Sequence, residues 1–262
     1  MKNDKLALSL PSAKEILPDV IRQLGYPASR ELNEDIRGEV EGAVDEGLKK
    51  TKPAGLYKMT PLLRQEKGLL VGRDVEIRSP RWARLVKTLK EPEVICCFVV
   101  TTGQALEEAI NEKQDESLFH AYLLDSVGSV VTERLTDQLE QHVSALLGVE
   151  GYQTTARFSP GYCDWELGEG QKALFRFLQP ESVGVTQTSA GMMIPQKSIS
   201  AVLVGAREVS LRSPCPFCSK EDCEYRRAEA KGSGIQGSAV RPRYPARFRG
   251  RARYGVGLVV AT

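Results

Sequence analysis

The chain has 262 residues, of which 41% are hydrophobic and 27% charged, the composition of an ordinary globular protein. No apolar run comes near the roughly 20 residues that span a membrane, and no apolar secretion signal follows the first residues, so we expect a cytoplasmic protein without a membrane partner. Six cysteines in a chain of this length do not indicate a disulfide scaffold. In a reducing compartment, clustered cysteines indicate metal ligands or reactive thiols.

The net charge of +2 is unevenly divided along the chain. Residues 224–262 contain nine basic and two acidic residues, a net of +7, which leaves −5 for residues 1–223. We therefore predict three parts: a globular body over 1–210, a cysteine-containing segment over 211–227, and a basic tail over 228–262. The Arg-, Gly- and Pro-rich composition predicts a disordered tail. Such a tail could dock to an acidic protein; we do not expect nucleic acid as its partner.

In chain order, hydrophobic periodicity and turn residues predict both helices and strands. The first half is predicted to contain a helix over 12–24 interrupted at Pro18, a helix over 29–50, strands over 56–63 and 69–78, and a short helix over 81–89. The second half is predicted to contain a strand over 93–102, helices from 103 and over 117–147 and 169–178, and strands over 152–158, 183–189 and 198–204. Long helices with antiparallel strands and no β-α-β alternation indicate an α+β fold.

Two of these elements carry further predictions. Residues 94–100 are continuously apolar, which indicates a strand buried on both faces, so Cys96 and Cys97 within it are expected in the core. The helix over 117–147 contains the cluster Asp-Ser-Val-Gly-Ser at 125–129, whose small residues permit close backbone approach. Glu133 lies off the centre of the apolar stripe of this helix, where a solvated surface carboxylate is the alternative to a functional one.

The segment RFSPGY, residues 157–162, is the strongest candidate for a binding site. Pro160 fixes the backbone and Gly161 lets the main chain approach a ligand closely. Arg157 before the turn offers a planar fork of donors for a carboxylate, and Tyr162 after it adds an aromatic face and a hydroxyl. The alternative is an ordinary corner between a strand and a loop.

Three segments together resemble the activation domain of cobalamin-dependent methionine synthase. They are DSVGSVVTE at 125–133, RFSPGY at 157–162 and TSAGMMIPQKSIS at 188–200, in the order and at the separations typical of that family. The resemblance covers roughly residues 10–210. Leu24-Gly-Tyr26, the strand around Tyr57 and Thr101-Thr-Gly103 also resemble free-standing versions of the domain.

The resemblance implies a function. Such domains bind S-adenosylmethionine and present it to cobalamin in the inactive cob(II)alamin state; an electron from a flavodoxin- or ferredoxin-type donor and the methyl group then restore methylcobalamin. By position in the motifs, the cofactor-binding residues would be Glu133, Arg157, Pro160, Gly161, Tyr162 and Ser189, where Ser189 stands in place of a family Glu. No catalytic residue of its own is implied. We expect Arg157→Ala to weaken binding and to leave the fold intact.

Neither histidine has the Asp-x-His-x-x-Gly context that holds cobalt in this class of corrinoid carrier. We therefore expect a stand-alone methyltransferase component, whose cobalamin is presented by a partner methionine synthase chain. Two alternatives are a reactivator of another corrinoid methyltransferase, and a metal-binding interaction module with a nucleic-acid-binding tail.

The segment CPFCSKEDC, residues 215–223, has the Cys-x2-Cys-x4-Cys spacing of metal ligands. Cys215, Cys218 and Cys223 would bind zinc or an iron–sulfur cluster, or would remain as redox thiols. No fourth ligand is evident nearby; Cys163, an exogenous ligand or another chain are candidates.

Overall fold

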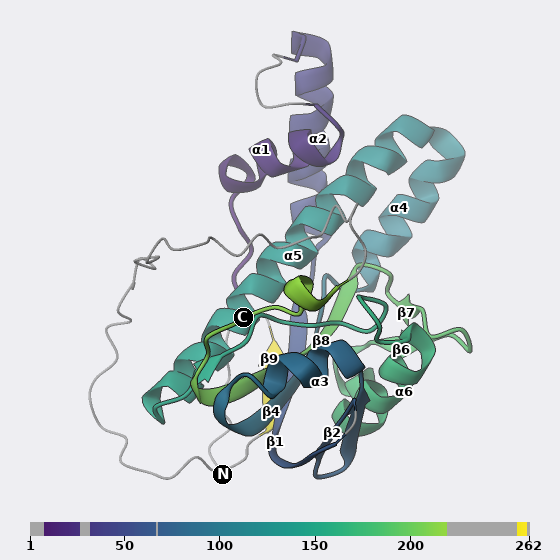
Figure 1. Ribbon diagram of the computed structural model, residues 1–262. Coiled ribbons are helices and arrows are strands. Elements are labelled where there is room, and N and C mark those ends of the chain that lie inside the picture. Colours follow the sequence, from purple (N-terminus) through teal and green to yellow (C-terminus); the bar gives the residue numbers. More distant parts are fainter. Residues whose placement is uncertain (1–7, 27–31, 67, 219–255, 261–262) are drawn as a thin grey trace.

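The structure is a computed structural model that describes residues 8–26, 32–66, 68–218 and 256–260 (Figure 1). The basic tail, Cys223 and the rest of residues 219–255 lie outside the described residues.

An antiparallel sheet forms the centre of the fold, in the strand order β3-β2-β1-β4-β8-β5. Its strands are β1 (Ala54–Glu66), β2 (Leu69–Gly72), β3 (Val75–Arg78), β4 (Lys90–Thr101), β5 (Gln153–Thr154) and β8 (Ser198–Glu208). A seventh strand, β9 (Val256–Val260), pairs with the first half of β1. A separate hairpin joins β6 (Thr186–Gln187) to β7 (Met193–Ile194). Every strand pair is antiparallel, which confirms the predicted α+β class.

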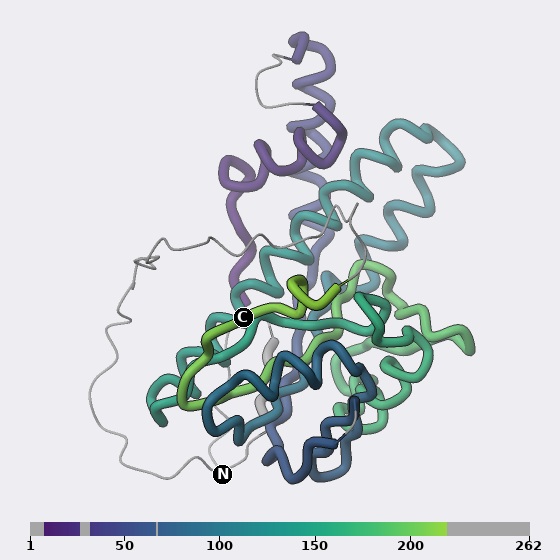
Figure 2. Tube along the Cα trace, viewed as in Figure 1, coloured from purple at the N-terminus to yellow at the C-terminus, as the bar shows by residue number. Residues whose placement is uncertain are grey.

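Helices cover both faces of this sheet. The helices are α1 (Ala13–Gln23), α2 (Glu34–Lys50), α3 (Pro80–Val86), α4 (Gln104–Glu116), α5 (Leu118–Val149) and α6 (Leu167–Leu178). Buried side chains of α1, α2, α4 and α5 form one core cluster with the sheet, and those of α3 and α6 form the other. In Figures 1 and 2, α1 and α2 extend beyond the sheet beside the upper part of α5.

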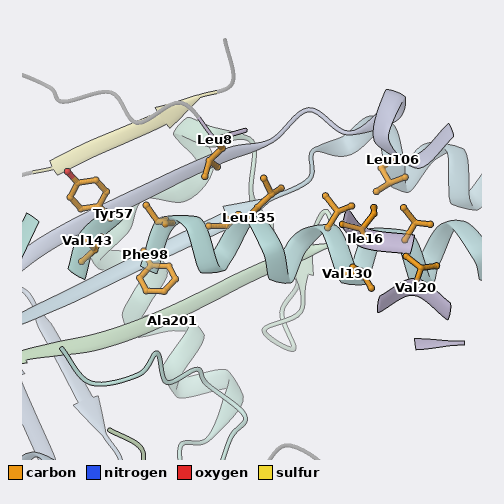
Figure 3. Close-up of a cluster of buried hydrophobic side chains, with 14 of the residues drawn as sticks. Leu8, Ile16, Val20, Tyr57, Phe98, Leu106, Val130, Leu135, Val143 and Ala201 are labelled. Carbon is orange, nitrogen blue, oxygen red and sulfur yellow. The ribbon is translucent and has the colours of Figure 1, made fainter. Parts of the chain in front are cut away.

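Strand β4 alternates between these two cores, as its continuous apolar run predicts. Cys96 and Phe98 belong to the α5 side, and Cys97 and Val99 to the α3–α6 side. Both cysteines are fully buried, which confirms their core assignment, and burial raises the pKa of each thiol. Figure 3 shows Phe98 and Val143 of α5 among the side chains of the first cluster.

Helix α5 is long because its apolar stripe has continuous cover. Leu124, Val127, Val131, Leu135 and Leu139 are completely buried against the sheet and its neighbouring helices. Ser117 begins the helix by accepting a hydrogen bond from the His120 backbone N–H at 3.3 Å.

Several predicted boundaries were wrong for local reasons. Helix α1 continues through Pro18, because burying Ile16 and Val20 outweighs one lost backbone bond. The single strand predicted over 69–78 is a hairpin that turns at Asp74, whose φ of 65° is tolerated by Asp.

The strand predicted over 183–189 is reduced to β6. It is preceded by a 3-10 turn, η1 (Pro180–Val183), and by Gly184 with a φ of 74°. Among the described residues no helix is long and apolar enough to cross a membrane.

Candidate functional site

The three segments that carry the resemblance meet at one cavity of about 950 Å³. Its walls come from α5, from residues 157–163, from residues 191–200 and from residues 213–218. The last segment follows β8 and lies beside the RFSPGY segment, because the Ala156 N–H donates to the Arg212 carbonyl oxygen at 2.9 Å. Residues separated by more than 50 positions therefore share one wall.

Aromatic stacking fixes the RFSPGY segment against the sheet. Phe158 lies between Trp82 and Trp165, with ring centroids 5.3 and 5.5 Å away and interplanar angles of 15°. All three rings are buried, and Phe158 exchanges backbone hydrogen bonds with Val202 of β8. Alternation along the chain then directs Arg157, the preceding residue, to the opposite side, toward α5.

The turn after Phe158 is closed by backbone hydrogen bonds. Gly161 has a φ of 88°, a conformation that favours glycine, and its N–H donates to the Trp165 carbonyl oxygen at 2.8 Å. Asp164 then accepts bonds from the Ser79 hydroxyl at 2.6 Å and from the Arg81 backbone N–H at 2.9 Å, at the beginning of α3. This loop is therefore fixed at both ends.

Arg157 lies among three carboxylates of α5. Its Nη2 donates to Glu133 at 2.5 Å, and its Nη1 donates to Asp137 and to Glu140, each at 2.6 Å. Glu140 also accepts the Arg157 backbone N–H at 3.2 Å. Positions 133, 137 and 140 are spaced four and three apart, so they lie on one face of the helix.

This cluster is acidic and unevenly exposed. The side chains of Arg157 and Glu140 are each 13% exposed, whereas those of Asp137 and Glu133 are 45% and 56% exposed. Burial opposes the charge on Arg157, but Glu140 and Asp137 outweigh it and raise the pKa of the guanidinium. The stability that this raised pKa contributes is fully present below the pKa of Arg157 in the unfolded chain. It therefore does not change across the neutral pH range. One guanidinium faces three carboxylates, so the cluster is acidic, and Glu133 is the carboxylate of the three that lines the cavity.

The Asp-Ser-Val-Gly-Ser cluster of α5, residues 125–129, holds the third segment, residues 188–200, in place. Lys197 pairs with Asp125 at 2.7 Å and donates to the Ser129 hydroxyl at 3.0 Å. A β-carbon at Gly128 would lie 3.0 Å from the Lys197 side chain and 3.1 Å from Leu106. The absence of that β-carbon therefore permits close approach of these two side chains, whereas the sequence predicted close approach of backbone.

The structure brings five of the six predicted cofactor-binding residues to the cavity. They are Glu133, Arg157, Pro160, Gly161 and Tyr162. Ser189 is exposed in the turn before Gly191 and is not among the lining residues.

The sequence did not single out three other polar residues of the wall. Ser213 is 5% exposed, and its hydroxyl has no hydrogen-bond partner within the described part of the chain. Gln171 and Ser200, both buried, are joined by a hydrogen bond of 2.9 Å from the serine hydroxyl. Ser200 lies in the third motif; no pattern in the sequence points to Ser213 or Gln171.

Three cysteines also line this cavity: Cys163, Cys215 and Cys218. The thiols of Cys163 and Cys218 lie 3.8 and 3.9 Å from Nη1 of Arg81. Burial and the hydrogen bond to Cys218 raise the pKa of Cys163 to about 11, although Arg81 acts in the opposite direction. Across the described ranges, no group of three Cys, His, Asp or Glu side chains is already gathered around a metal position.

Comparison with known proteins gives one family and one fold. A family model described as "Vitamin B12 dependent methionine synthase, activation domain" matches residues 61–213. Among solved structures, the chain is similar to one described as "Crystal Structure of the MetH Reactivation Domain bound to AdoHcy", with a TM-score of 0.53. The two share 14% sequence identity over 80% of this chain and 81% of that one, so this likeness shows the fold alone. No curated protein matches the chain significantly.

Proposed function

The chain belongs to the family of vitamin B12-dependent methionine synthase activation domains, and from this premise we propose that it binds S-adenosylmethionine in the cavity beside Arg157. The observation that supports this most directly is the meeting of all three family motifs at that cavity. Its volume of about 950 Å³ is at the upper end for pockets that hold ligands of this size.

The charges of the cavity wall fit this ligand. S-adenosylmethionine carries a carboxylate, an ammonium and a sulfonium, so it presents one negative and two positive charges. Arg157 supplies one guanidinium, and three carboxylates surround it. Among the lining residues, Glu133 offers a carboxylate while Arg157 and Arg81 offer guanidinium groups, and a wall with charges of both signs complements such a ligand better than an exclusively basic wall would.

Arg157 and Glu133 would exchange partners when the ligand enters. Three of the five N–H groups of the guanidinium bond to α5 carboxylates. Glu133 is the most exposed of these partners and the one that lines the cavity. The ligand carboxylate would take over at Nη2, and the released Glu133 would pair with the ligand ammonium. Glu140 would keep Arg157 in position throughout.

Three further side chains would orient the ligand. The buried Ser213 hydroxyl gains a hydrogen-bond partner if a polar ligand atom reaches it, which removes the cost of an unsatisfied buried group. Tyr162 and Met192 are 44% and 52% exposed at the cavity, and they offer apolar contact area.

The bound cofactor would serve as methyl donor in reactivation. The family reaction moves the methyl of S-adenosylmethionine to cobalamin after one-electron reduction by a flavodoxin- or ferredoxin-type donor. We infer that this chain acts as a stand-alone methyltransferase component in the cytoplasm and that a methionine synthase chain presents the cobalamin. The part of this chain would be to hold the methyl donor, without a catalytic residue of its own. Ser189 would contact the ligand only through the exposed turn that contains it.

Glu133 and Asp137 form a matched pair for testing this proposal. Each bonds Arg157 and each is about half exposed, but only Glu133 lines the cavity. We expect Glu133→Gln to weaken binding of S-adenosylmethionine by roughly 10- to 100-fold, since a charge-assisted bond contributes about 1.5–3 kcal/mol. Asp137→Asn should change the dissociation constant by less than about threefold. Titration calorimetry on the full chain measures both.

Two results would contradict the proposal. No heat of binding with the wild-type chain at millimolar S-adenosylmethionine would exclude the ligand itself. Equal losses in Glu133→Gln and Asp137→Asn would mean that both act only through Arg157, and would remove the direct role of Glu133.

A further inference from the structure

Three cysteines from two distant parts of the chain lie in one wall of the cavity. Cys163 follows the RFSPGY segment, while Cys215 and Cys218 follow β8. Cys163 and Cys218 are close enough to share a hydrogen bond, and both contact the same guanidinium nitrogen of Arg81. This convergence results from tertiary packing, because more than 50 residues separate the two segments.

Cys215 and Cys218 are joined by a tight turn. Cys215 begins the 3-10 turn η2 (Cys215–Phe217) and Cys218 follows it, with the Cys218 N–H donating to the Cys215 carbonyl oxygen at 3.1 Å. In a 3-10 turn, side chains three positions apart leave the same side of the backbone. Cys215 is therefore one turn away from the pair formed by Cys163 and Cys218, although its sulfur is not yet gathered with theirs.

Cys163 occupies a backbone conformation that favours glycine. Its φ is 57°, in the left-handed region where a β-carbon is unfavourable. This exposed residue is thus held in a backbone conformation that costs energy. Backbone strain of this kind clusters at functional sites, so it supports a functional role for Cys163.

Arg81 would balance the charge of a thiolate centre. Cysteine ligands bind metals as thiolates, so three of them around a divalent ion leave excess negative charge. Nη1 of Arg81 lies 3.8 and 3.9 Å from two of the sulfurs, and its own backbone N–H bonds Asp164, next to Cys163. The cation is therefore held beside the sulfurs by the same loop that positions Cys163.

We propose that Cys163, Cys215 and Cys218 hold a thiophilic metal centre, zinc or an iron–sulfur cluster, in the wall of the cavity. The chemistry common to both is thiolate ligation, and Cys163 is the ligand that comes from outside the Cys-x2-Cys segment. The centre ties residues 215–218 to the loop after RFSPGY, and so fixes one wall of the cavity. Cys223 lies outside the described residues and carries no part of this argument.

The test is metal analysis of the full chain, purified without oxygen and then reconstituted with zinc or with iron and sulfide. Iron, acid-labile sulfide and zinc are counted per chain, and visible absorption separates a cluster from zinc. We expect one centre per chain, and at least a fivefold loss of metal in Cys163→Gly, Cys215→Ser and Cys218→Ser. Cys97→Ala, which removes a buried core thiol, is the control and should retain the metal.

Cys163→Gly separates loss of a ligand from loss of folding. Glycine suits the left-handed backbone at this position, so the metal-free variant should unfold at or above the temperature of the metal-free wild type. Full metal content in Cys163→Gly would overturn the proposal, as would a wild-type chain that takes up neither zinc nor a cluster. Because metal analysis needs no S-adenosylmethionine, its outcome is independent of the proposed function.

Discussion

Removing the guanidinium of Arg157 should destabilise the protein as well as weaken ligand binding. Arg157 and Glu140 are each 13% exposed, and two bonds join them, one from the guanidinium and one from the Arg157 backbone N–H. In Arg157→Ala, Glu140 would lose its only described cationic partner while remaining mostly buried. Breaking a buried ion pair in this way costs about 3–5 kcal/mol.

The geometry of the cluster reduces that figure. Glu133 and Asp137 are about half exposed, so water can solvate their carboxylates once the guanidinium is gone. The ion pair of each with Arg157 therefore contributes only about 0–1 kcal/mol to the free energy of unfolding. Glu140 can also relax toward solvent or take up a proton. We therefore expect Arg157→Ala to lower the free energy of unfolding by about 2–4 kcal/mol, out of a total of about 5–15 kcal/mol.

Urea unfolding followed by tryptophan fluorescence measures this change. Trp82 and Trp165 are buried on either side of Phe158, so they report on the segment that contains Arg157. A loss of 3 kcal/mol corresponds to a fall of about 1 M in the urea midpoint if the slope is about 3 kcal/mol/M.

The double variant Arg157→Ala/Glu140→Ala is the control. It removes the unpaired charge and should recover about 1–2 kcal/mol relative to Arg157→Ala, a coupling typical of residues in contact. A single variant within about 0.5 kcal/mol of wild type, or strictly additive effects in the cycle, would refute the reasoning.

Three further changes test how the site is built. Phe158→Ala should lower the free energy of unfolding by about 3–5 kcal/mol, because it empties the space between two indole rings. The near-ultraviolet circular dichroism signal of the tryptophans should be lost, and an unchanged urea midpoint would contradict the stacking. Gly170→Ala should lower the free energy of unfolding by about 1–3 kcal/mol, because its β-carbon would lie 2.7 Å from Pro160. Gly42→Ala, in open space within α2, should raise it by about 0.5–1 kcal/mol. Equal shifts of the unfolding temperature in the two variants would contradict this. Lys197→Met should weaken binding of S-adenosylmethionine by about 3- to 10-fold, because Lys197 would lose its ion pair with Asp125 and no longer hold the third segment against α5. An unchanged dissociation constant in calorimetry would exclude this positioning role of Lys197.

The sequence by itself determined the class of fold and the position of the main elements. The continuous apolar run at 94–100 can only be buried on both faces, and the stripe along α5 can only face a core, so both features are local and readable. Motif order also identified the family, and with it five residues that line the cavity. Small errors at Pro18 and Asp74 arose where packing or a tolerated φ outweighed propensity.

Tertiary structure alone decided which groups meet. The spacing of Glu133, Asp137 and Glu140 places them on one helical face, but nothing local says that Arg157 faces them. For that reason a cleft arginine, expected to leave the fold intact when removed, proves to be the mostly buried partner of a carboxylate, and we now predict a stability cost.

Tertiary packing also explains why the sequence did not reveal the contacts of the cysteines and of Ser213. The metal-like spacing of Cys215 and Cys218 is a local pattern, and the sequence offered Cys163 only as one candidate among several. The packing of residues 213–218 beside the RFSPGY loop places Cys163 next to Cys218 and turns the Ser213 hydroxyl into the cavity wall. Contacts of this kind depend on how the chain returns to itself after β8, which hydrophobic periodicity does not encode.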